Sequence, residues 1–369
     1  MLTSDFDFEF PESQIALRPL PRGEARLMVV PATGTLPADF PLPVEPEGWA
    51  FGQAKDLARI LRPGDRLALN DTKVLRARLY GTLDGGGAIE VLLLKPRFIG
   101  SEGGSDDSAT SIWECMAKPG KKLQPGRGVD FGSGLSAIVV DILPGGERVL
   151  RFNAAGAAFY EALEKVGRIP LPPYIRRDAD VADAETYQTV FAENLGSVAA
   201  PTASLHLSES LLADLAAHGI GSSKLTLHVG AGTFRPVQTE RAEDHPMHSE
   251  TYVLPESSAV ALNATRAQGG RIVAVGTTAS RVLETRADAN GILRAGAGET
   301  DIFIHPGYHW KAVDALLTNF HWPKSTLFIL VASKLGKEDE GIRRAKAAYA
   351  EAIRRGFRLF SYGDGMLII

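Results

Sequence analysis

The sequence predicts an α/β protein: a mixed α/β main domain interrupted by a small all-β barrel domain. Length is the first reason, because 369 residues are enough for two domains or for one large domain with an insertion. The second is that strand and helix patterns alternate toward both ends of the chain. The third is that residues 74–153 hold short apolar or alternating runs between glycine-rich turns, with no convincing helix. We therefore expect a main domain of residues 1–73 and 154–369 and a barrel of residues 74–153.

The first part of the main domain contains two expected strands, Leu27–Val30 and Arg66–Asn70. A short helix around Leu57 lies between them and ends at Pro63. The second strand runs into the polar residues Asn70–Lys73. Polar residues at a strand end are natural site residues, but Asx turns use the same residue types for structural reasons. Both interpretations stay open.

The segment Gly196–Val237 organises the rest of the main domain. His206 precedes an amphipathic helix, for which Ser208 is a plausible N-cap. Leu225–Val229 alternates like a strand, carries His228, and runs into the turn Gly230–Arg235. Histidines and a tight glycine turn on a rigid unit can form a polar pocket. A buried strand that leaves the core through a glycine turn is an equally good interpretation.

Two further polar segments precede helices near the C-terminus. Gly276-Thr277-Thr278 follows the expected strand Arg271–Val275 and starts a helix with Arg281. Such a helix start exposes N–H groups that bind anions, although helix capping alone would also explain the threonines. The polar run Asn319–Thr326 leads into an apolar helix. We also expect strands at Asp301–Ile304 and Phe357–Ser361.

Composition restricts the class of protein. An apolar content of 44% and a charged content of 23% are ordinary for a folded soluble protein, and no apolar run approaches the ~20 residues that span a bilayer. The single cysteine, Cys115, excludes internal disulfides and multi-cysteine zinc sites. The N-terminus lacks the pattern of a signal peptide. We therefore expect a cytoplasmic enzyme with no membrane partner. We also expect a monomer, although composition does not determine the oligomeric state.

The charge pattern permits a nucleic-acid substrate without requiring one. The formal net charge of −4 argues against bulk electrostatic binding of nucleic acid. Lys118–Arg127 nevertheless carries four positive charges and no acidic residue. A solvated surface is the common role of such a run.

Several familiar catalytic motifs are missing. We find no P-loop, no dinucleotide-binding fingerprint, no serine-hydrolase elbow and no H-E-x-x-H zinc motif. The run His245–Glu250 could hold a metal, but a surface loop is the simpler interpretation. We therefore expect no metal and no prosthetic group, so that acid–base groups and binding energy carry the chemistry.

Taken together, short motifs along the whole chain resemble one family. The motifs are Phe8-Glu9, Pro11-Glu12-Ser13, Arg18–Arg22, Asn70–Leu75, Ile89–Leu93, Tyr187–Phe191, Gly196–Ala203, Thr226–Val237, His248-Ser249-Glu250, Gly276-Thr277-Thr278, Asn319-Phe320-His321, Pro323–Thr326 and Tyr362-Gly363-Asp364. In this order they resemble the S-adenosylmethionine:tRNA ribosyltransferase-isomerases of queuosine biosynthesis. The chain differs at a few positions, such as Trp322, where relatives usually have leucine.

The resemblance implies a specific reaction and a two-part architecture. The family transfers and isomerises the ribosyl moiety of S-adenosylmethionine onto the aminomethyl group of a 7-deazaguanine at the tRNA wobble position. Epoxyqueuosine forms, and adenine and methionine leave. The resemblance thus implies S-adenosylmethionine as co-substrate and a tRNA with the 7-deazaguanine precursor in its anticodon as partner. It also implies an α/β domain interrupted by a small β-barrel.

This reaction needs a base near the sulfonium, a donor that helps adenine leave, and a pocket that keeps the acceptor amine unprotonated. His206 and His228 are the first candidates for proton transfer, with His321 a weaker one. Asp71 and Glu250 are expected near ribose hydroxyls or the sulfonium. The candidate substrate-binding residues are Asn70, Thr72, Lys73, Pro201, Thr202, Gly230, Gly232, Thr233, Phe234, Arg235, Gly276, Thr277, Thr278, Arg281, Asn319, Lys324 and Ser325. For each of these residues a structural role is about as plausible.

Some of these residues have more specific expected roles. Arg235, Lys324 and the Gly276–Thr278 helix start are expected to hold the methionine carboxylate or a tRNA phosphate. Tyr174, Phe234 and Tyr308 are possible stacking partners for an extruded base. We expect four polar ends, Asn70–Lys73, Gly196–Val237, Gly276–Thr278 and Asn319–Thr326, to converge on one pocket.

Three alternatives stay open. A methyltransferase would release S-adenosylhomocysteine instead of adenine. A divergent S-adenosylmethionine-dependent RNA-modifying enzyme would use another acceptor. A non-catalytic RNA-binding protein would bind tRNA without S-adenosylmethionine.

Overall fold

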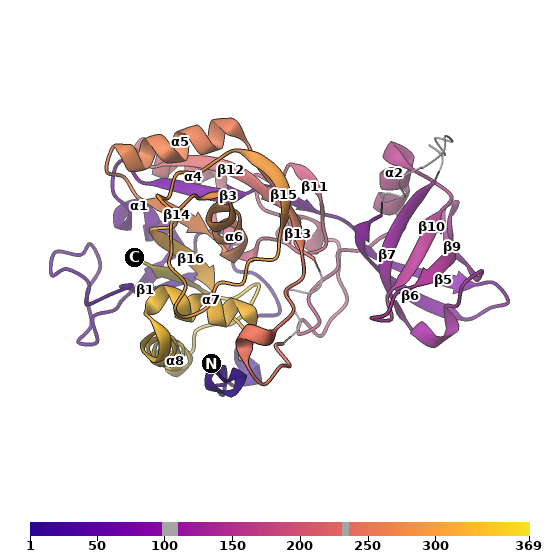
Figure 1. The fold of residues 1–369 in the computed structure, drawn as a ribbon, viewed down its shortest axis with the longest axis horizontal. Coiled ribbons are helices and arrows are strands. Elements are labelled where there is room, and N and C mark those ends of the chain that lie inside the picture. Colours follow the sequence, from indigo (N-terminus) through magenta and orange to yellow (C-terminus); the bar gives the residue numbers. More distant parts are fainter. Residues whose placement is uncertain (98–109, 231–235) are drawn as a thin grey trace.

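The computed structural model describes residues 1–97, 110–230 and 236–369 and shows a main part with a barrel beside it (Figure 1). The barrel is closed, in the order β10-β7-β6-β5-β8-β9. Its strands are β5 (Arg78–Leu83), β6 (Ala88–Pro96), β7 (Ser111–Lys118), β8 (Gly128–Gly132), β9 (Leu135–Ile142) and β10 (Arg148–Phe152). The α/β class with an all-β barrel, which the sequence predicts, is confirmed.

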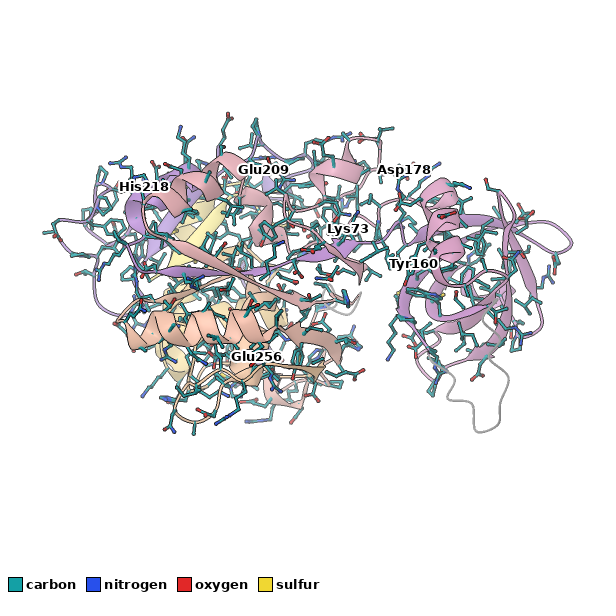
Figure 2. The ribbon with its side chains drawn as sticks, turned by 90° about the horizontal axis from the view of Figure 1, so that it is seen from above. Lys73, Tyr160, Asp178, Glu209, His218 and Glu256 are labelled. Carbon is teal, nitrogen blue, oxygen red and sulfur yellow. The ribbon has the colours of Figure 1, made fainter. Side chains whose placement is uncertain are left out.

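The helix α2 (Gly156–Val166) packs onto the barrel, although it follows the last barrel strand. Its Phe159 is buried and contacts Trp113 and Phe152 of the barrel, with ring centroids 5.5 and 5.0 Å apart. Figure 2 shows Tyr160 of this helix on the barrel side and Lys73 at the facing end of the main part. The six barrel strands lie within residues 74–153. The exact domain boundaries stay a prediction.

The main part is built on a nine-stranded sheet in the order β15-β13-β12-β3-β14-β16-β17-β1-β2. Its strands are β1 (Arg26–Val30), β2 (Ala50–Gln53), β3 (Arg66–Asn70), β12 (Gly221–Leu227), β13 (Glu250–Leu254), β14 (Ile272–Val275), β15 (Gly296–Thr300), β16 (Ala315–Asn319) and β17 (Gly365–Ile368). The neighbours β12, β3, β14 and β16 are parallel. Their carboxyl ends therefore meet at one edge, where ligands of open α/β sheets bind.

Helices cover both faces of this sheet. The larger core holds side chains of α5 (Glu256–Ala267), α6 (Thr277–Arg286), α7 (Thr326–Leu335) and α8 (Glu338–Arg354). The core on the other face holds α1 (Leu57–Ile60) and α4 (Glu209–Ala217). Within β3, Ala68 joins the first core and Leu67 and Leu69 join the second, as alternation along a strand requires.

Smaller elements complete the described chain. A two-stranded sheet pairs β4 (Thr72–Val74) with β11 (Asn194–Ser197). The short helix α3 (Asp183–Thr186) and several 3-10 segments lie in the connections: η1 (Thr3–Phe6), η2 (Glu12–Gln14), η3 (Ala54–Asp56), η4 (Gly120–Lys122), η5 (Thr202–His206) and η7 (Ala242–Asp244). None of the helices in the described ranges is long and apolar enough to cross a membrane.

Two expected strands are wrong. Asp301–Ile304 is irregular, and the strand lies just before it, as β15. The pairing of β15 with β13 ends at Thr300 opposite Glu250, the first residue of β13, so no partner continues the ladder. Phe357–Ser361 is not a strand either, because Phe360 has a φ of 68°, outside the β region. The closing strand is the apolar β17 instead.

Candidate active site

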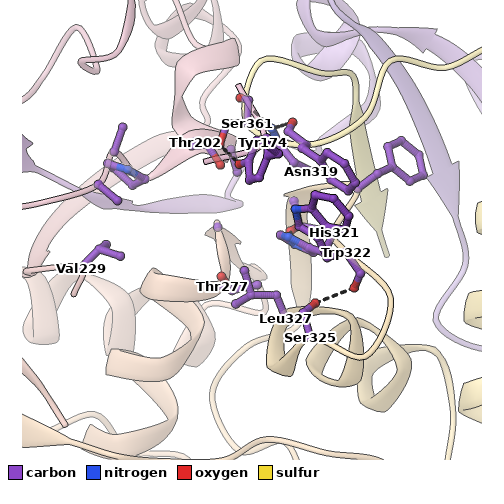
Figure 3. Close-up of a pocket in the computed structure, with 18 of the residues that line it drawn as sticks. Tyr174, Thr202, Val229, Thr277, Asn319, His321, Trp322, Ser325, Leu327 and Ser361 are labelled. Carbon is purple, nitrogen blue, oxygen red and sulfur yellow. Dashed lines mark hydrogen bonds between the residues drawn. The ribbon is translucent and has the colours of Figure 1, made fainter. Parts of the chain in front are cut away.

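A cavity of about 380 Å³ opens at the carboxyl edge of the sheet, among the ends of β12, β14 and β16 (Figure 3). Three of the four polar ends that the sequence singles out contribute to its wall: Val229 after β12, Gly276–Thr278 after β14, and Asn319–Pro323 with Ser325 after β16. Pro201 and Thr202 line it as well. The predicted convergence is therefore observed for these three segments.

The start of α6 forms one polar end of the cavity. Its N-cap is Gly276, which has a φ of 93° and a ψ of 157°, a conformation that only glycine adopts without strain. Glycine has no side chain to cap the helix, so the first N–H groups stay open to a ligand. Thr278 does not cap it either, because its buried Oγ1 has no hydrogen-bond partner among the residues that the structure describes. Thr277 and Thr278 both line the cavity, which makes this helix start a site for an anion.

The start of α7 is closed by its own side chain. Ser325 Oγ accepts a hydrogen bond from the Phe328 N–H at 3.1 Å and donates one to the Trp322 carbonyl at 2.7 Å. This is the N-cap arrangement that helix starts favour. Although Ser325 lines the cavity, its hydroxyl is already occupied within the protein.

Aromatic rings form another wall. The rings of Trp322 and Phe360 stack, with their centroids 4.5 Å apart and their planes at 11°. The ring centroid of Tyr174 lies 5.7 Å from that of Trp322. All three line the cavity. The Tyr174 hydroxyl is 2.5 Å from Ser361 Oγ, and burial raises the pKa of this phenol, which keeps it neutral. Flat apolar faces of this kind suit a purine or deazapurine base.

His206 lies behind the cavity wall and acts on it through Asn319. The Asn319 side-chain amide donates to the carbonyls of Phe360 and Ser361, at 2.9 and 3.1 Å. Its Oδ1 therefore faces His206 Nε2, 3.0 Å away, and this nitrogen must carry the proton. Burial lowers the pKa of His206, so the ring is neutral near pH 7. His206 itself is not part of the cavity lining.

His321 is the histidine that lines the cavity. Its Nε2 is 2.8 Å from Thr318 Oγ1, and its backbone N–H donates to the Tyr349 hydroxyl. Burial lowers its pKa to about 3, so His321 is neutral at physiological pH. A neutral imidazole in a cavity can accept a proton at one nitrogen and donate one from the other.

The cluster Asn70–Lys73 lies outside this lining. The Asn70 side chain bonds both the N–H and the carbonyl of Leu227, at 3.0 Å each, and accepts from the Thr72 N–H, so it connects β3 to β12. Asp71 accepts from Thr226 Oγ1 at 2.7 Å. Thr72 Oγ1 lies 2.7 Å from His228 Nδ1, and Lys73 is exposed.

His228 is not part of the cavity lining, although its neighbour Val229 is. Gly196 allows its ring to approach, since a Cβ there would lie 2.8 Å from His228 Cε1. Burial lowers the pKa of His228. His228 and Asp71 therefore form a second polar cluster near the junction with the barrel.

Glu250 and Arg281 form a buried ion pair next to the cavity. Glu250 also accepts from the Gly230 N–H at 2.9 Å, and Arg281 donates to the Thr300 carbonyl at 3.1 Å. Both line a small hollow of about 30 Å³, which shares Leu327 with the main cavity. Removing one partner of such a buried pair leaves the other charge buried and unpaired, which strongly destabilises the fold.

The remaining predicted residues either lie away from the cavity or fall outside the described ranges. Lys324 does not line the cavity, and its Nζ pairs with Asp7 at 2.6 Å on the surface. Tyr308 donates to Glu284 and is not part of the lining. The predicted residues Gly232, Thr233, Phe234 and Arg235 lie outside the described residues.

The lining residues outside the predicted polar ends and the predicted stacking residues include Pro173, Arg176, Leu327, Phe360 and Ser361. Ser361 adjoins the motif Tyr362-Gly363-Asp364, which was a usable signal. Phe360 carried none, because its segment resembled an apolar strand. Within the described ranges, no group of three or more His, Cys, Asp or Glu is placed to hold a metal ion.

Comparison with known proteins places this geometry in context. A family model described as queuosine biosynthesis protein matches residues 3–368. Proteins named S-adenosylmethionine:tRNA ribosyltransferase-isomerase from Cereibacter sphaeroides and Geobacter sulfurreducens are 48% and 45% identical, over 100% of this chain and 99% and 100% of theirs. A crystal structure of S-adenosylmethionine tRNA ribosyltransferase from Thermotoga maritima matches with a TM-score of 0.52 and 31% identity, over 99% of this chain and 100% of that one.

Proposed function

The chain belongs to this family of queuosine biosynthesis proteins, the S-adenosylmethionine:tRNA ribosyltransferase-isomerases, and we propose that the cavity at the carboxyl edge of its sheet is the active site. There the ribosyl moiety of S-adenosylmethionine is transferred and isomerised onto the aminomethyl group of a 7-deazaguanine at the wobble position of a tRNA. Epoxyqueuosine-tRNA, adenine and methionine are the products. We expect the enzyme to work as a monomer in the cytoplasm.

One observation carries this assignment: an open helix start and an aromatic wall line the same cavity. S-adenosylmethionine has a carboxylate at one end and a purine at the other. The carboxylate fits the N–H groups of α6 with Thr278 Oγ1, where the helix dipole favours a negative charge. A purine fits against the Trp322 ring.

His321 is the group we assign to proton transfer, ahead of His206 and His228. It lines the cavity, whereas the other two do not. Its low pKa keeps the ring neutral but also makes it a weak base, so the role we assign to it is to donate an N–H to the departing adenine. His206 positions Asn319 and the loop that carries Phe360.

The desolvated cavity also serves the acceptor amine. An amine in an apolar, partly enclosed space loses its preference for the ammonium form, because burial disfavours the charged state. The aromatic wall and the apolar Val229 and Leu327 supply that environment. The amine is nucleophilic only without its extra proton, so the same desolvation favours attack.

The decisive experiment identifies the products. The chain is incubated with S-adenosylmethionine and a tRNA that carries the deazaguanine precursor, and the released base and the modified nucleoside are identified by mass spectrometry. Adenine together with epoxyqueuosine is the expected result. Release of S-adenosylhomocysteine would identify a methyltransferase, adenine with another nucleoside would identify another acceptor, and tRNA binding without either would identify an RNA-binding protein.

Variants then test the residue assignments. His321→Asn is expected to lower kcat about 100-fold or more, because it removes the proton-transfer group. His206→Gln keeps a donor toward Asn319 and is expected to lower kcat less than His321→Asn. Equal kcat in His321→Asn and in the unaltered chain would refute the role of His321.

A further inference from the structure

A second hollow lies between the barrel and the main part. Its volume is about 290 Å³. The barrel side carries Leu92 of β6 and Met116 of β7, and the opposite wall is the segment Pro170–Pro173 with Val198. We call this space the junction groove. Met116 is 41% exposed, so its apolar side chain is accessible to a ligand in the groove.

The groove is held open by fixed contacts. The first strand of the barrel is tied to the main part by the reciprocal backbone hydrogen bonds of Arg78 with Arg168, at 3.1 and 2.9 Å. Arg78 also donates to the Leu171 carbonyl at 3.3 Å and pairs with Glu90. The prolines of Pro170–Pro173 restrict the other wall. The groove is therefore a formed feature with two defined walls.

The groove adjoins the active-site cavity. Pro173 lines both spaces, and Val198 of the groove is followed by Ala199 of the cavity. An RNA that places one nucleotide in the cavity can therefore place a neighbouring nucleotide in the groove. The wobble base must leave its stack to enter the cavity, so its neighbours in the loop also lose stacking partners.

The charge at the groove suits a nucleic acid. Lys118 lines it and is exposed, and it begins the run Lys118–Arg127 with four positive charges and no acidic residue. Arg168, also exposed, lies over the ring of Tyr80 at 5.2 Å. Arg168 does not itself line the groove. Among the lining residues Glu90 is paired with Arg78, which leaves Lys118 as the charge of the basic rim. An apolar slot with such a rim matches a nucleotide, whose base is flat and whose phosphate is negative.

We propose that the junction groove binds the nucleotide next to the modified one in the anticodon loop, with its base between Met116 and Pro170–Pro173 and its phosphate near Lys118. This inference rests on the proposed function, since it requires tRNA as the substrate. The groove thereby holds the loop in register while the wobble base occupies the cavity. A protein partner would also cover apolar surface, but the basic rim favours the nucleotide.

The test compares two charge insertions on the barrel. Met116→Glu places a carboxylate in the groove, and Ile138→Glu places the same charge on β9, at a position 45% exposed that does not line the groove. Both side chains are exposed, so both variants are expected to fold. The dissociation constant of a fluorescent anticodon stem–loop is measured by anisotropy, alongside KM for the stem–loop and for S-adenosylmethionine.

We expect Met116→Glu to weaken stem–loop binding about 10-fold, the size of one lost base-stacking contact, and Ile138→Glu to change it less than twofold. KM for S-adenosylmethionine stays within twofold in both. Removing the base on one side of the wobble nucleotide is expected to raise the dissociation constant of the stem–loop for the unaltered chain about 10-fold. For Met116→Glu, removing the same base is expected to raise the dissociation constant little. Equal stem–loop affinity of the two variants overturns the proposal.

Adenine release tests the proposed function, whereas stem–loop affinity tests the junction groove, so the two proposals can fail separately. If the unaltered chain binds the stem–loop but releases no adenine, the proposed function fails, and the groove is still judged by the affinities. If adenine is released and Met116→Glu binds like Ile138→Glu, only the groove fails. The phosphate contact is tested separately: Lys118→Gln is expected to reduce the slope of log Kd against log salt by about one. An unchanged slope overturns that contact.

Discussion

Two helices, α6 and α7, begin at the same edge of the sheet and at the same cavity, yet their starts differ. Ser325 closes α7 by accepting from the Phe328 N–H. At α6 the corresponding position is Gly276, and the nearby Thr278 hydroxyl is buried without a partner in residues 1–97, 110–230 and 236–369. One helix start is completed by the protein, and the other needs an external anion.

The difference shows how to separate a structural polar residue from a functional one. The hydrogen-bonding capacity of Ser325 is used within the chain, so its substitution affects folding first. Thr278 Oγ1 is buried without a partner in the described part of the chain, and such a group costs folding free energy unless a ligand binds there. The same distinction applies to Asn70, whose side chain bonds Thr72 and Leu227 although it stands at a strand end.

Filling the open helix start gives the largest expected effect. Thr278→Asp puts a carboxylate into the first turn of α6, where it competes with the substrate carboxylate and repels it. We expect KM for S-adenosylmethionine to rise about 100-fold, while the helix dipole keeps the protein as stable as before. Steady-state kinetics and thermal unfolding measure the two. A KM within threefold of the unaltered value would contradict the open-start interpretation.

The loop before α7 carries His321, whose effect depends on pH. Its folded pKa of about 3 lies below the unfolded value of about 6.5, so the unfolded chain binds more protons between these two values. Stability is therefore unaffected above pH 6.5 and falls as the pH drops toward 3. His321→Gln removes this contribution. Between pH 7 and pH 5 we expect the free energy of unfolding of this variant to fall by about 2 kcal/mol less than that of the unaltered chain. Denaturant unfolding at both pH values measures this, and parallel losses would count against a buried neutral His321.

Opening the closed helix start is the converse experiment. Ser325→Ala removes the N-cap of α7 and is expected to lower the free energy of unfolding by about 1 kcal/mol. KM for S-adenosylmethionine should change less than threefold, because this hydroxyl is bound within the protein. Should KM rise tenfold while stability stays constant, α7 would be the anion site instead of α6.

The smallest effect is expected at Lys324. Its ion pair with Asp7 is exposed, with side chains 40% and 51% accessible, and such pairs contribute about 0–1 kcal/mol. Lys324→Gln should change KM for S-adenosylmethionine less than twofold. A rise comparable to that of Thr278→Asp would return Lys324 to the carboxylate site that the sequence suggested.

Much of the fold follows from local patterns. Arg66–Asn70 was expected as a strand and is one, because its central residues Leu67–Leu69 are apolar and a proline–glycine pair precedes the strand. The barrel was predictable because its strands are short and separated by glycine turns. The segment Phe357–Ser361 was not, since the positive φ of Phe360 is set by tertiary contacts such as the hydrogen bond from its N–H to the Phe320 carbonyl.

The site was predictable as strand ends but not as individual contacts. Gly276–Thr278 and Asn319 line the cavity because the carboxyl ends of parallel strands share an edge. Whether a residue faces the cavity depends on the path of the chain after β12, where Val229 lines the cavity and the neighbouring His228 does not. The position of His206 behind Asn319 depends on a contact 113 residues apart in the chain, which no local pattern encodes.

The most direct test of the open helix start compares two ligands by calorimetry. S-adenosylmethionine and its decarboxylated analogue differ only in the carboxylate that α6 is proposed to bind. We expect the unaltered chain to bind S-adenosylmethionine about 100-fold more tightly than the analogue, and Thr278→Asp to lose most of that preference. Equal affinity of the unaltered chain for the two ligands would contradict the account.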